Sequence, residues 1–314
     1  GVLYILDAVG PRLVQVTPEA NGDFENAVAT TIDLAGAALV NPRGLAWHPG
    51  IGHLYLVSQA SQTLIEVTPT GQVVSTRDLS TLGLSNPQAV VFAPSGDLTD
   101  DTAALSLYIA DAGQAIAAQS ADDPSLVEVG CTTAEACPNT LYLPLVIGDQ
   151  EETTVVEAET VASTVPANAG TIVEVSLAAP TAAAASSFTA ALVRSVDLTT
   201  LAPAIPDPSG LTYLPNRNTL LISDGEVEET VAGITHFQGA NVWELGLNGS
   251  VVRTANISKV TPSVVRMTNE PTGAAWNPNN GHYYISDDDA RRIYDLNPGA
   301  DGLVGTADDT WTFF

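Results

Sequence analysis

Lysine is almost missing from this chain. Lys259 is the only lysine among 314 residues, and ten basic residues stand against 36 Asp and Glu, so the formal net charge is -26. Such a surface repels phosphate backbones and anionic headgroups, because non-specific nucleic-acid contacts begin with Lys or Arg neutralising phosphate. The composition therefore predicts that nucleic acid is not a partner.

Long apolar runs are also lacking. No uninterrupted stretch approaches the roughly 20 residues of a membrane-spanning helix, so we expect no membrane span. The chain opens at Gly1 with "VLYIL", which already reads as a strand and follows neither a basic segment nor a cleavage site. We read the chain as processed or trimmed, which leaves a removed signal peptide open.

Cysteine is scarce. Cys131 and Cys137 are the only two, and both lie in the polar stretch "GCTTAEACPNT" with no zinc-type Cys/His cluster around them. A small-loop disulfide in an oxidising compartment is the favoured interpretation, and two free thiols are the alternative. The sequons at Asn248 and Asn256 offer glycosylation sites. Together these features favour an extracellular or cell-surface location.

What fills the chain is a repeat. Helical periodicity of useful length is absent, and four lines begin alike with a turn and a short apolar strand: "NPRGLAWHP" from Asn41, "NPQAVVFAP" from Asn86, "DPSGLTYLP" from Asp207 and "EPTGAAWNP" from Glu270. A second strand follows each, as in "HLYLVS", "SLYIAD", "TLLISD" and "HYYISD", and the opening "VLYILD" is a fifth copy of it. Third strands such as "TLIEVTP" and polar fourth strands such as "VVSTRDL" complete the unit. Strands of this length and spacing predict an almost wholly β chain.

The spacing of the repeat indicates a β-propeller. Equivalent second strands end at Asp7, Ser58, Asp111, Asp224 and Asp287, in steps of 51 to 63 residues apart from one step of 113. Four-stranded units at such intervals are typical of propeller blades, each of which buries its faces only against its neighbours. We therefore predict one all-β propeller domain over residues 1–314 with five recognisable four-stranded blades.

The repeated phrase resembles the NHL-repeat propellers and their relatives, the regucalcin/gluconolactonase and phytase-like propellers. The resemblance covers nearly the whole chain outside residues 112–169 and implies about six blades. Residues 112–169 are either a degenerate blade or, as their acidic and Thr-rich part favours, a long insertion. We also expect residues 178–191 to be loop or short helix.

The first unit lacks its Pro-x-Gly inner strand, and nothing after "TWTFF" supplies one within the sequence. We expect this vacancy to be completed either by residues outside the chain or by a neighbouring molecule. The second case would be a head-to-tail contact between copies, which builds a filament unless it closes.

This chain lacks the residues that the activities of these families need at the matching positions. The resemblance implies a metal held by inner-strand carboxylates and amides, but the matching positions are Arg43, Gln88, Ser209 and Thr272, which do not form a shell for a hard cation. Phosphate esters need several Lys or Arg donors, which this chain does not cluster.

Histidine offers no catalytic triad either. His48, His53 and His282 lie in equivalent blade turns, which favours a structural role, and His236 stands alone.

Two acidic sets remain as candidate cation sites. Asp301, Asp308 and Asp309 bracket glycines in "NPGADGLVGTADDTW", which suits Ca²⁺ and equally a plain Asp-Gly hairpin turn. Equivalent strands end at Asp7, Asp111, Asp224 and Asp287. The favoured interpretation is that these aspartates cap turns, and the alternative is that their carboxylates converge on a cation at one face of the ring. Ca²⁺ is the only cofactor that the sequence suggests.

These observations favour a secreted or surface propeller that acts as a non-catalytic binding or structural module. Its partners would be an extracellular protein, a glycan or further copies of itself. The alternatives are a calcium-dependent hydrolase, either a phytase-like esterase or a lactonase, and a self-assembling extracellular filament subunit.

Overall fold

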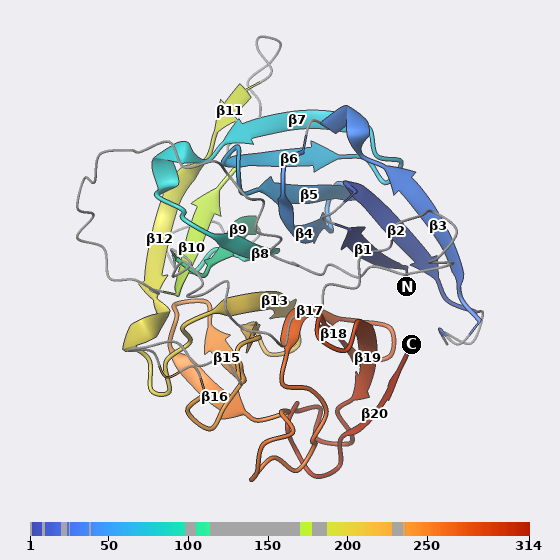
Figure 1. Ribbon diagram of the computed structural model, residues 1–314. Helices are drawn as coiled ribbons and strands as arrows, with labels where there is room; N and C mark the ends of the chain where they lie inside the picture. The colour runs from blue at the N-terminus through green and yellow to red at the C-terminus, as the bar shows by residue number, and fades with distance from the viewer. Residues whose placement is uncertain are drawn as a thin grey trace, which may run out of the picture.

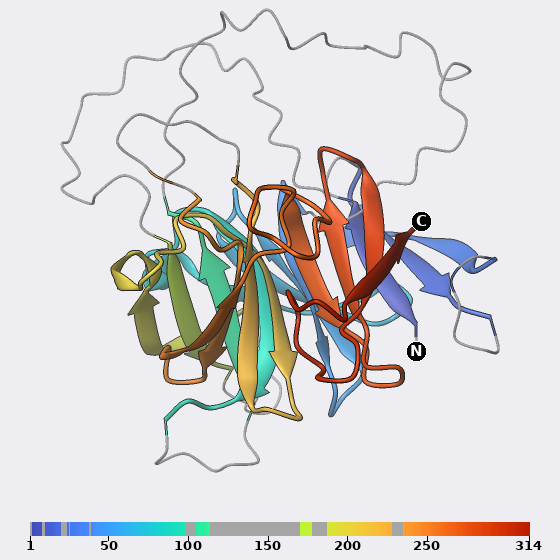
Figure 2. The same ribbon diagram turned by 90° about the horizontal axis from the view of Figure 1, so that it is seen from below.

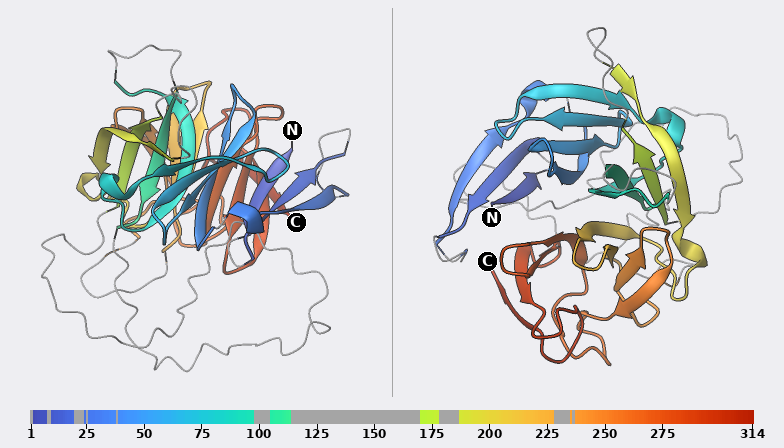
Figure 3. Two further views of the ribbon diagram at one scale, coloured as in Figure 1. Left: turned by 90° about the horizontal axis from the view of Figure 1, so that it is seen from above. Right: turned by 180° about the vertical axis from the view of Figure 1, so that it is seen from behind.

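Five β-sheets surround a common axis in the computed structural model (Figure 1). The structure describes residues 2–97, 105–113, 170–177 and 187–314, apart from residues 8, 9, 20–23, 25, 38, 228–234 and 236. The sheets follow one another around the ring in chain order, and the two termini lie side by side (Figure 3). Described residues thus form the five blades recognised in the sequence.

Blade 1 contains β1 (Leu3–Asp7), β2 (Arg12–Thr17) and β3 (Val28–Asp33). Blade 2 contains β4 (Pro42–His48), β5 (His53–Ser58), β6 (Thr63–Val67) and β7 (Val73–Asp78). Blade 3 contains β8 (Pro87–Pro94), β9 (Leu105–Asp111), β10 (Thr171–Ser176) and β12 (Ala191–Asp197). Blade 4 contains β13 (Pro208–Leu214), β14 (Thr219–Asp224), β15 (Val242–Gly246) and β16 (Val251–Ala255). Blade 5 contains β17 (Pro271–Trp276), β18 (Tyr283–Asp287), β19 (Arg292–Asn297) and β20 (Thr310–Phe313).

In each of blades 2 to 5, four consecutive blade strands pair antiparallel, and the inner one carries the Pro-containing phrase. The order from the axis outward is β4, β5, β6, β7 in blade 2, and the other three repeat it. Three short 3₁₀ turns, Ala35–Ala37, Ser80–Leu82 and Leu198–Thr200, follow β3, β7 and β12. Seen from below, the blades stand side by side around the axis (Figure 2). Among the described residues, no helix is long and apolar enough to cross a bilayer.

Blade 3 is interrupted between its second and third strands. β9 and β10 pair directly, with Asp111 opposite Thr171, although 59 residues separate those two partners in the sequence (112 to 170). The long step of the repeat therefore falls inside one blade. Cys131 and Cys137 lie in this interval, outside the described residues.

One short strand differs from expectation. Residues 178–191 were expected to form loop or short helix. Residues 178–186 lie outside the described residues, but β11 (Ser187–Thr189) lies parallel to β7 and extends blade 2 to five strands. β12 then begins at Ala191 in the next blade. The prediction was wrong here because the pairing partner, β7, lies about a hundred residues earlier and leaves no local pattern.

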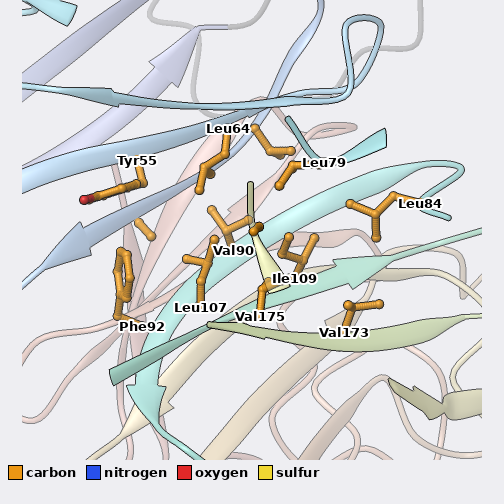
Figure 4. Packing of buried hydrophobic residues seen from close by; sticks show 13 residues of the cluster. Tyr55, Leu64, Leu79, Leu84, Val90, Phe92, Leu107, Ile109, Val173 and Val175 are labelled. Carbon is orange, nitrogen blue, oxygen red and sulfur yellow. The ribbon is translucent and has the colours of Figure 1, made fainter. Parts of the chain in front are cut away.

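Apolar side chains fill the seams between the blades. Five buried clusters each join two neighbouring blades, and the cluster between blades 2 and 3 includes Leu64, Val90, Leu107 and Val175 (Figure 4). Side chains alternate along each strand, so successive residues face the two neighbouring seams. The core is therefore distributed around the ring, which explains why each blade needs both neighbours.

The first and last blades lie next to one another and close the ring. The described residues give blade 1 three strands, of which β1 is the innermost. Phe24 stacks on Phe314, with ring centroids 5.6 Å apart, and meets the edge of Tyr284 at 5.2 Å. Ile5, Val14 and Ile293 are buried in the same seam. Side-chain packing thus joins blade 1 to blade 5 at this seam, where the described residues place no strand on the inner side of β1.

Candidate functional site

A cavity of about 120 Å³ lies at the centre of the ring. Its wall comes from the inner strands of blades 2 to 5, from residues 3–6 of β1 and from neighbouring parts of β18 and β19. Most of the lining is apolar or small, with hydroxyls at Ser209, Thr272 and Ser286. A partly open, mainly apolar space with a few convergent polar groups has the character of a small ligand site, although its volume is below the roughly 300–1,000 Å³ of most ligand pockets.

Arg43 is the one charged side chain that the described residues contribute to the cavity wall. It is 6% exposed, and neither Nε nor Nη1 has a hydrogen-bond partner among the described residues. Desolvation lowers the pKa of Arg43 to about 10, while the nearby carboxylate of Asp207 acts in the opposite direction. Arg43 therefore stays charged at neutral pH, and its unbonded guanidinium nitrogens are costly in this environment.

The four inner-strand positions singled out in the sequence do come together. Arg43, Gln88, Ser209 and Thr272 all line the cavity. The Ser209 hydroxyl donates to the carbonyl of Asp207 at 3.1 Å. This set can hydrogen-bond a ligand, but it offers no carboxylate to a metal ion or to acid–base chemistry.

The recurrent strand-end residues tie each second strand to the chain entering the inner strand. Asp111 accepts from the backbone N–H of Ser85 at 2.9 Å, and Asp224 accepts from that of Asp207 at 3.2 Å. Asp287 accepts from the hydroxyl of Thr268. These bonds agree with the interpretation of the aspartates as turn caps.

Asp7, in blade 1, accepts from Nε of Arg12 at 2.8 Å and from the N–H of Gly10 at 3.4 Å. Burial, followed by the charge of Asp207, raises the pKa of Asp224 to about 7. Among the described residues, no group of three or more His, Cys, Asp or Glu is placed to hold a metal ion. Convergence of the four carboxylates on a cation stays a prediction.

The acidic loop near the C-terminus is internally hydrogen-bonded. Asp308 accepts from the N–H of Ala300 at 2.8 Å, Asp309 from that of Gly305 at 2.7 Å and Asp301 from that of Leu303 at 2.7 Å. These bonds match a self-capped turn, and Ca²⁺ binding by the three aspartates stays a prediction.

Two histidines occupy matching positions at the corners between first and second strands. Nδ1 of His53 lies 2.7 Å from Oε1 of Glu66, and Nδ1 of His282 lies 2.7 Å from Oδ1 of Asp295. His48 instead packs beside Phe92, with ring centroids 4.5 Å apart. These contacts give the three histidines structural surroundings, whereas His236 is outside the described residues.

Sequence reasoning missed a second set of acids. Glu66, Glu174, Glu244 and Asp295 occupy the same place on the third strands of blades 2 to 5. Glu174 accepts from the hydroxyl of Ser95 at 2.8 Å. Glu244 accepts from Nε of Arg217 at 2.8 Å. Each therefore fastens the corner of its own inner hairpin, at the end opposite the capping aspartates, and the recurring Glu or Asp in the third-strand phrase was the available signal.

The two sequons lie in polar turns. Asn248 is exposed, and its amide oxygen accepts from the hydroxyl of Ser250 at 2.7 Å. The amide oxygen of Asn256 accepts from the hydroxyl of Ser258 at 2.6 Å, and Ser258 is fully buried. Glycosylation at both positions stays a prediction.

Comparison with known proteins supports the fold of this chain and no specific function. No known family profile matches the sequence, and no curated protein matches it. The chain has the β-propeller fold. Solved structures that it resembles include a nidogen/laminin complex, with 11% identity over 96% of this chain and 73% of that one at a TM-score of 0.47.

Two enzymes are among the other structures found. A streptogramin B lyase is 11% identical over 100% of this chain and 65% of its own, with a TM-score of 0.40. A gluconolactonase from Xanthomonas campestris is 12% identical over 94% of this chain and 78% of its own, with a TM-score of 0.41. The roles of these neighbours are mixed, and the fold-level resemblance read from the sequence is confirmed.

Proposed function

We propose that the protein is a non-catalytic binding module whose ligand occupies the central cavity. The observation that carries this proposal is the cavity itself, which is mainly apolar, contains one buried cation at Arg43 and runs along the inner side of β1. A site of this kind can hold a ligand by apolar burial and hydrogen bonds. The polar groups in its wall are suited to recognition.

The two recurrent sets of acids hold parts of the blades together through hydrogen bonds. The strand-end aspartates cap the entry to the inner strands, and the third-strand acids bind hairpin corners. Their repetition in successive blades supports a structural role, because a catalytic residue would be needed at one place only.

The proposed setting is the cell exterior, and the proposed partner is an extracellular protein or a glycan. The net charge of -26, the sequons at Asn248 and Asn256 and the cysteine pair support this setting. The same charge opposes a nucleic-acid partner.

An occlusion variant tests the proposal. Ala274 lines the cavity, so Ala274→Phe fills it, whereas Ala29→Phe adds the same ring to the exposed strand β3. Oligosaccharides and peptides that raise the melting temperature of the parent should lose this effect in the first variant and keep it in the second.

Turnover assays distinguish the alternative. Lactones and phosphate esters should remain unchanged with the parent protein, with or without Ca²⁺. Hydrolysis that requires Ca²⁺ and disappears in a variant of the acidic loop or of the strand-end aspartates would replace our proposal with the calcium-dependent hydrolase.

A further inference from the structure

The inner strands of blades 2 to 5 carry matching irregularities around the ring axis. In β4 the pairing with β5 shifts register between Arg43 and Leu45. The same shift occurs directly after the first proline of β8, β13 and β17, where the pairing passes over Gln88, Ser209 and Thr272. A bulge of this kind re-aims a side chain, and bulges are over-represented next to functional sites. The four bulges thus bring one cation and three neutral polar side chains to the wall of the central cavity.

Arg43 has no bonded counter-ion among the described residues. None of the ion pairs between those residues involves it, and its Nε and Nη1 have no hydrogen-bond partner there. The charge of Asp207 acts on Arg43, but desolvation outweighs it and lowers the pKa of Arg43 to about 10. Arg43 belongs to blade 2 and Asp207 precedes β13 of blade 4, so the charge of Arg43 lies toward the ring axis. An anion in the cavity would offset the cost of burying this guanidinium.

The rest of the cavity wall decides which anion fits. Apolar residues such as Leu45, Val90 and Leu211 form much of it, and the described residues contribute no carboxylate. Phosphate is poorly suited, because its oxygens need several basic donors and the described part of the wall has only Arg43. A carboxylate on a short apolar chain is well suited, because a guanidinium binds a carboxylate through two parallel hydrogen bonds and the apolar wall removes the chain from water.

We propose that the central cavity binds a carboxylate attached to a short apolar chain, and that Arg43 pairs with the carboxylate. This inference rests on the proposed binding function and gives the chemistry of its ligand. Free organic acids carry such a group, and so does the C-terminal residue of a peptide. The net charge of -26 opposes non-specific binding of anions, so selective binding of a carboxylate by this protein requires a local cation.

Butyrate and butyramide test the need for a charge. The two molecules have nearly the same size and shape, but only butyrate is an anion at neutral pH. Isothermal titration calorimetry of the 314-residue protein should give a dissociation constant for butyrate of about 1 mM or lower. Butyramide should bind at least about tenfold more weakly, because a hydrogen bond between charged groups is stronger than one with a neutral acceptor. No saturable binding by butyrate up to about 10 mM, or equal binding by the two, overturns the proposal.

Charge variants locate the carboxylate. Arg43→Gln should weaken butyrate binding at least about tenfold and remove the preference over butyramide, whereas Arg43→Lys keeps the charge and should keep the preference. Lys259→Gln is the matched control, because Lys259 is exposed and its loss changes the net charge equally. Circular dichroism checks that the variants fold. A folded Arg43→Gln variant that binds butyrate as the parent does would contradict the assignment of Arg43.

The occlusion pair locates the cavity independently of Arg43. Butyrate binding should be lost in Ala274→Phe, which lines the cavity, and kept in Ala29→Phe on the exposed strand β3. Butyrate that still binds to Ala274→Phe lies elsewhere and overturns the proposal. If butyrate fails while neutral oligosaccharides or peptides stabilise the parent but not Ala274→Phe, the binding function stands and the carboxylate chemistry is wrong.

A peptide distinguishes the two sources of the carboxylate. The probe is an acetylated tripeptide that ends in valine, prepared with a free and with an amidated C-terminus. A parent protein that binds butyrate and prefers the free C-terminus to the amide about tenfold recognises a peptide end. One that binds butyrate and neither peptide recognises a free acid. Equal binding of the two peptides at the cavity would mean that the carboxylate is not read and would overturn the proposal.

Discussion

At the residue scale, the molecule depends on acids placed at both ends of its blades. The third-strand set shows this clearly, because Glu66, Glu174 and Glu244 are at most 7% exposed and each is hydrogen-bonded to its own hairpin corner. Their recurrence could be read in the sequence, but their partners could not. Ser95 and Glu174, for example, are 79 residues apart, and no spacing rule links such positions.

Glu244→Gln should destabilise the fold. Arg217 donates to Glu244 at 2.8 Å and Thr219 donates to it at 2.7 Å, while Glu244 is 2% exposed. Glu244 is the buried member of this pair and Arg217 is 22% exposed, so removing the buried charge costs about 2 kcal/mol through loss of a charged hydrogen bond. Asp295→Asn is the matched control, because its pair with His282 is about a quarter exposed and should cost about 1 kcal/mol or less. Urea unfolding compares the two, and equal losses would refute the role of burial.

Asp224 should make stability depend on pH. Burial and then Asp207 raise the pKa of its carboxyl from 3.8 to about 7, so the folded state holds the proton more tightly than the unfolded state. Its contribution to stability is therefore fully present below pH 4 and is lost as pH rises through about 7. Asp224→Asn imitates the protonated form and should gain a few kcal/mol relative to the parent between pH 4 and 8. A constant difference in unfolding free energy across that range would exclude this linkage.

At the element scale, strands were predictable and their long-range pairing was not. The second strands end where the phrases predicted, at Asp7, Ser58, Asp111, Asp224 and Asp287. Alternation of apolar residues and turn chemistry are local signals. The parallel addition of β11 to β7 and the cavity along β1 depend instead on segments brought together by the closed ring. The cavity residues Arg43, Gln88, Ser209 and Thr272 were found from the sequence only as repeat-equivalent positions.

The interruption of blade 3 should be removable. Joining Gly113 to Gly170 leaves a three-residue loop, Ala-Gly-Gly, between Asp111 and Thr171, which already face one another. If residues 114–169 are an insertion, the shortened protein should keep one cooperative transition and unfold at an equal or higher urea concentration. The reason is closure entropy, which falls by about 0.6 kcal/mol for each halving of a loop. Loss of cooperative unfolding would show that the segment contributes a blade to the core.

The acidic loop after β19 gives a metal-removal experiment. If Asp301, Asp308 and Asp309 share Ca²⁺, a chelator should lower the melting temperature, because a ligand bound only by the folded state stabilises it. The double variant Asp308→Ala, Asp309→Ala should lose that dependence. If neither chelator nor added Ca²⁺ changes the melting temperature of the parent protein, this loop is a self-capped turn and not a cation site.

At the scale of the whole molecule, side chains join the first blade to the last and close the ring of described residues. The aromatic group of Phe24, Tyr284 and Phe314 joins the first blade to the last. The resemblance implied about six blades, whereas the described residues form five. The repeat itself gave five recognisable blades, and the described residues form those five; only the resemblance pointed to a higher number.

The assembly state is the last test, and it separates a binding module from a filament subunit. We expect the chain to remain monomeric, for two reasons. Each described inner strand is already paired in its own blade, and a net charge of -26 opposes the approach of identical molecules. Light scattering over a hundredfold range of concentration should therefore give one mass. High salt screens the repulsion without supplying a free strand, so the mass should not rise there either. A mass that grows with concentration would instead show contacts between copies, and fibres seen by electron microscopy would make head-to-tail assembly the function of the protein.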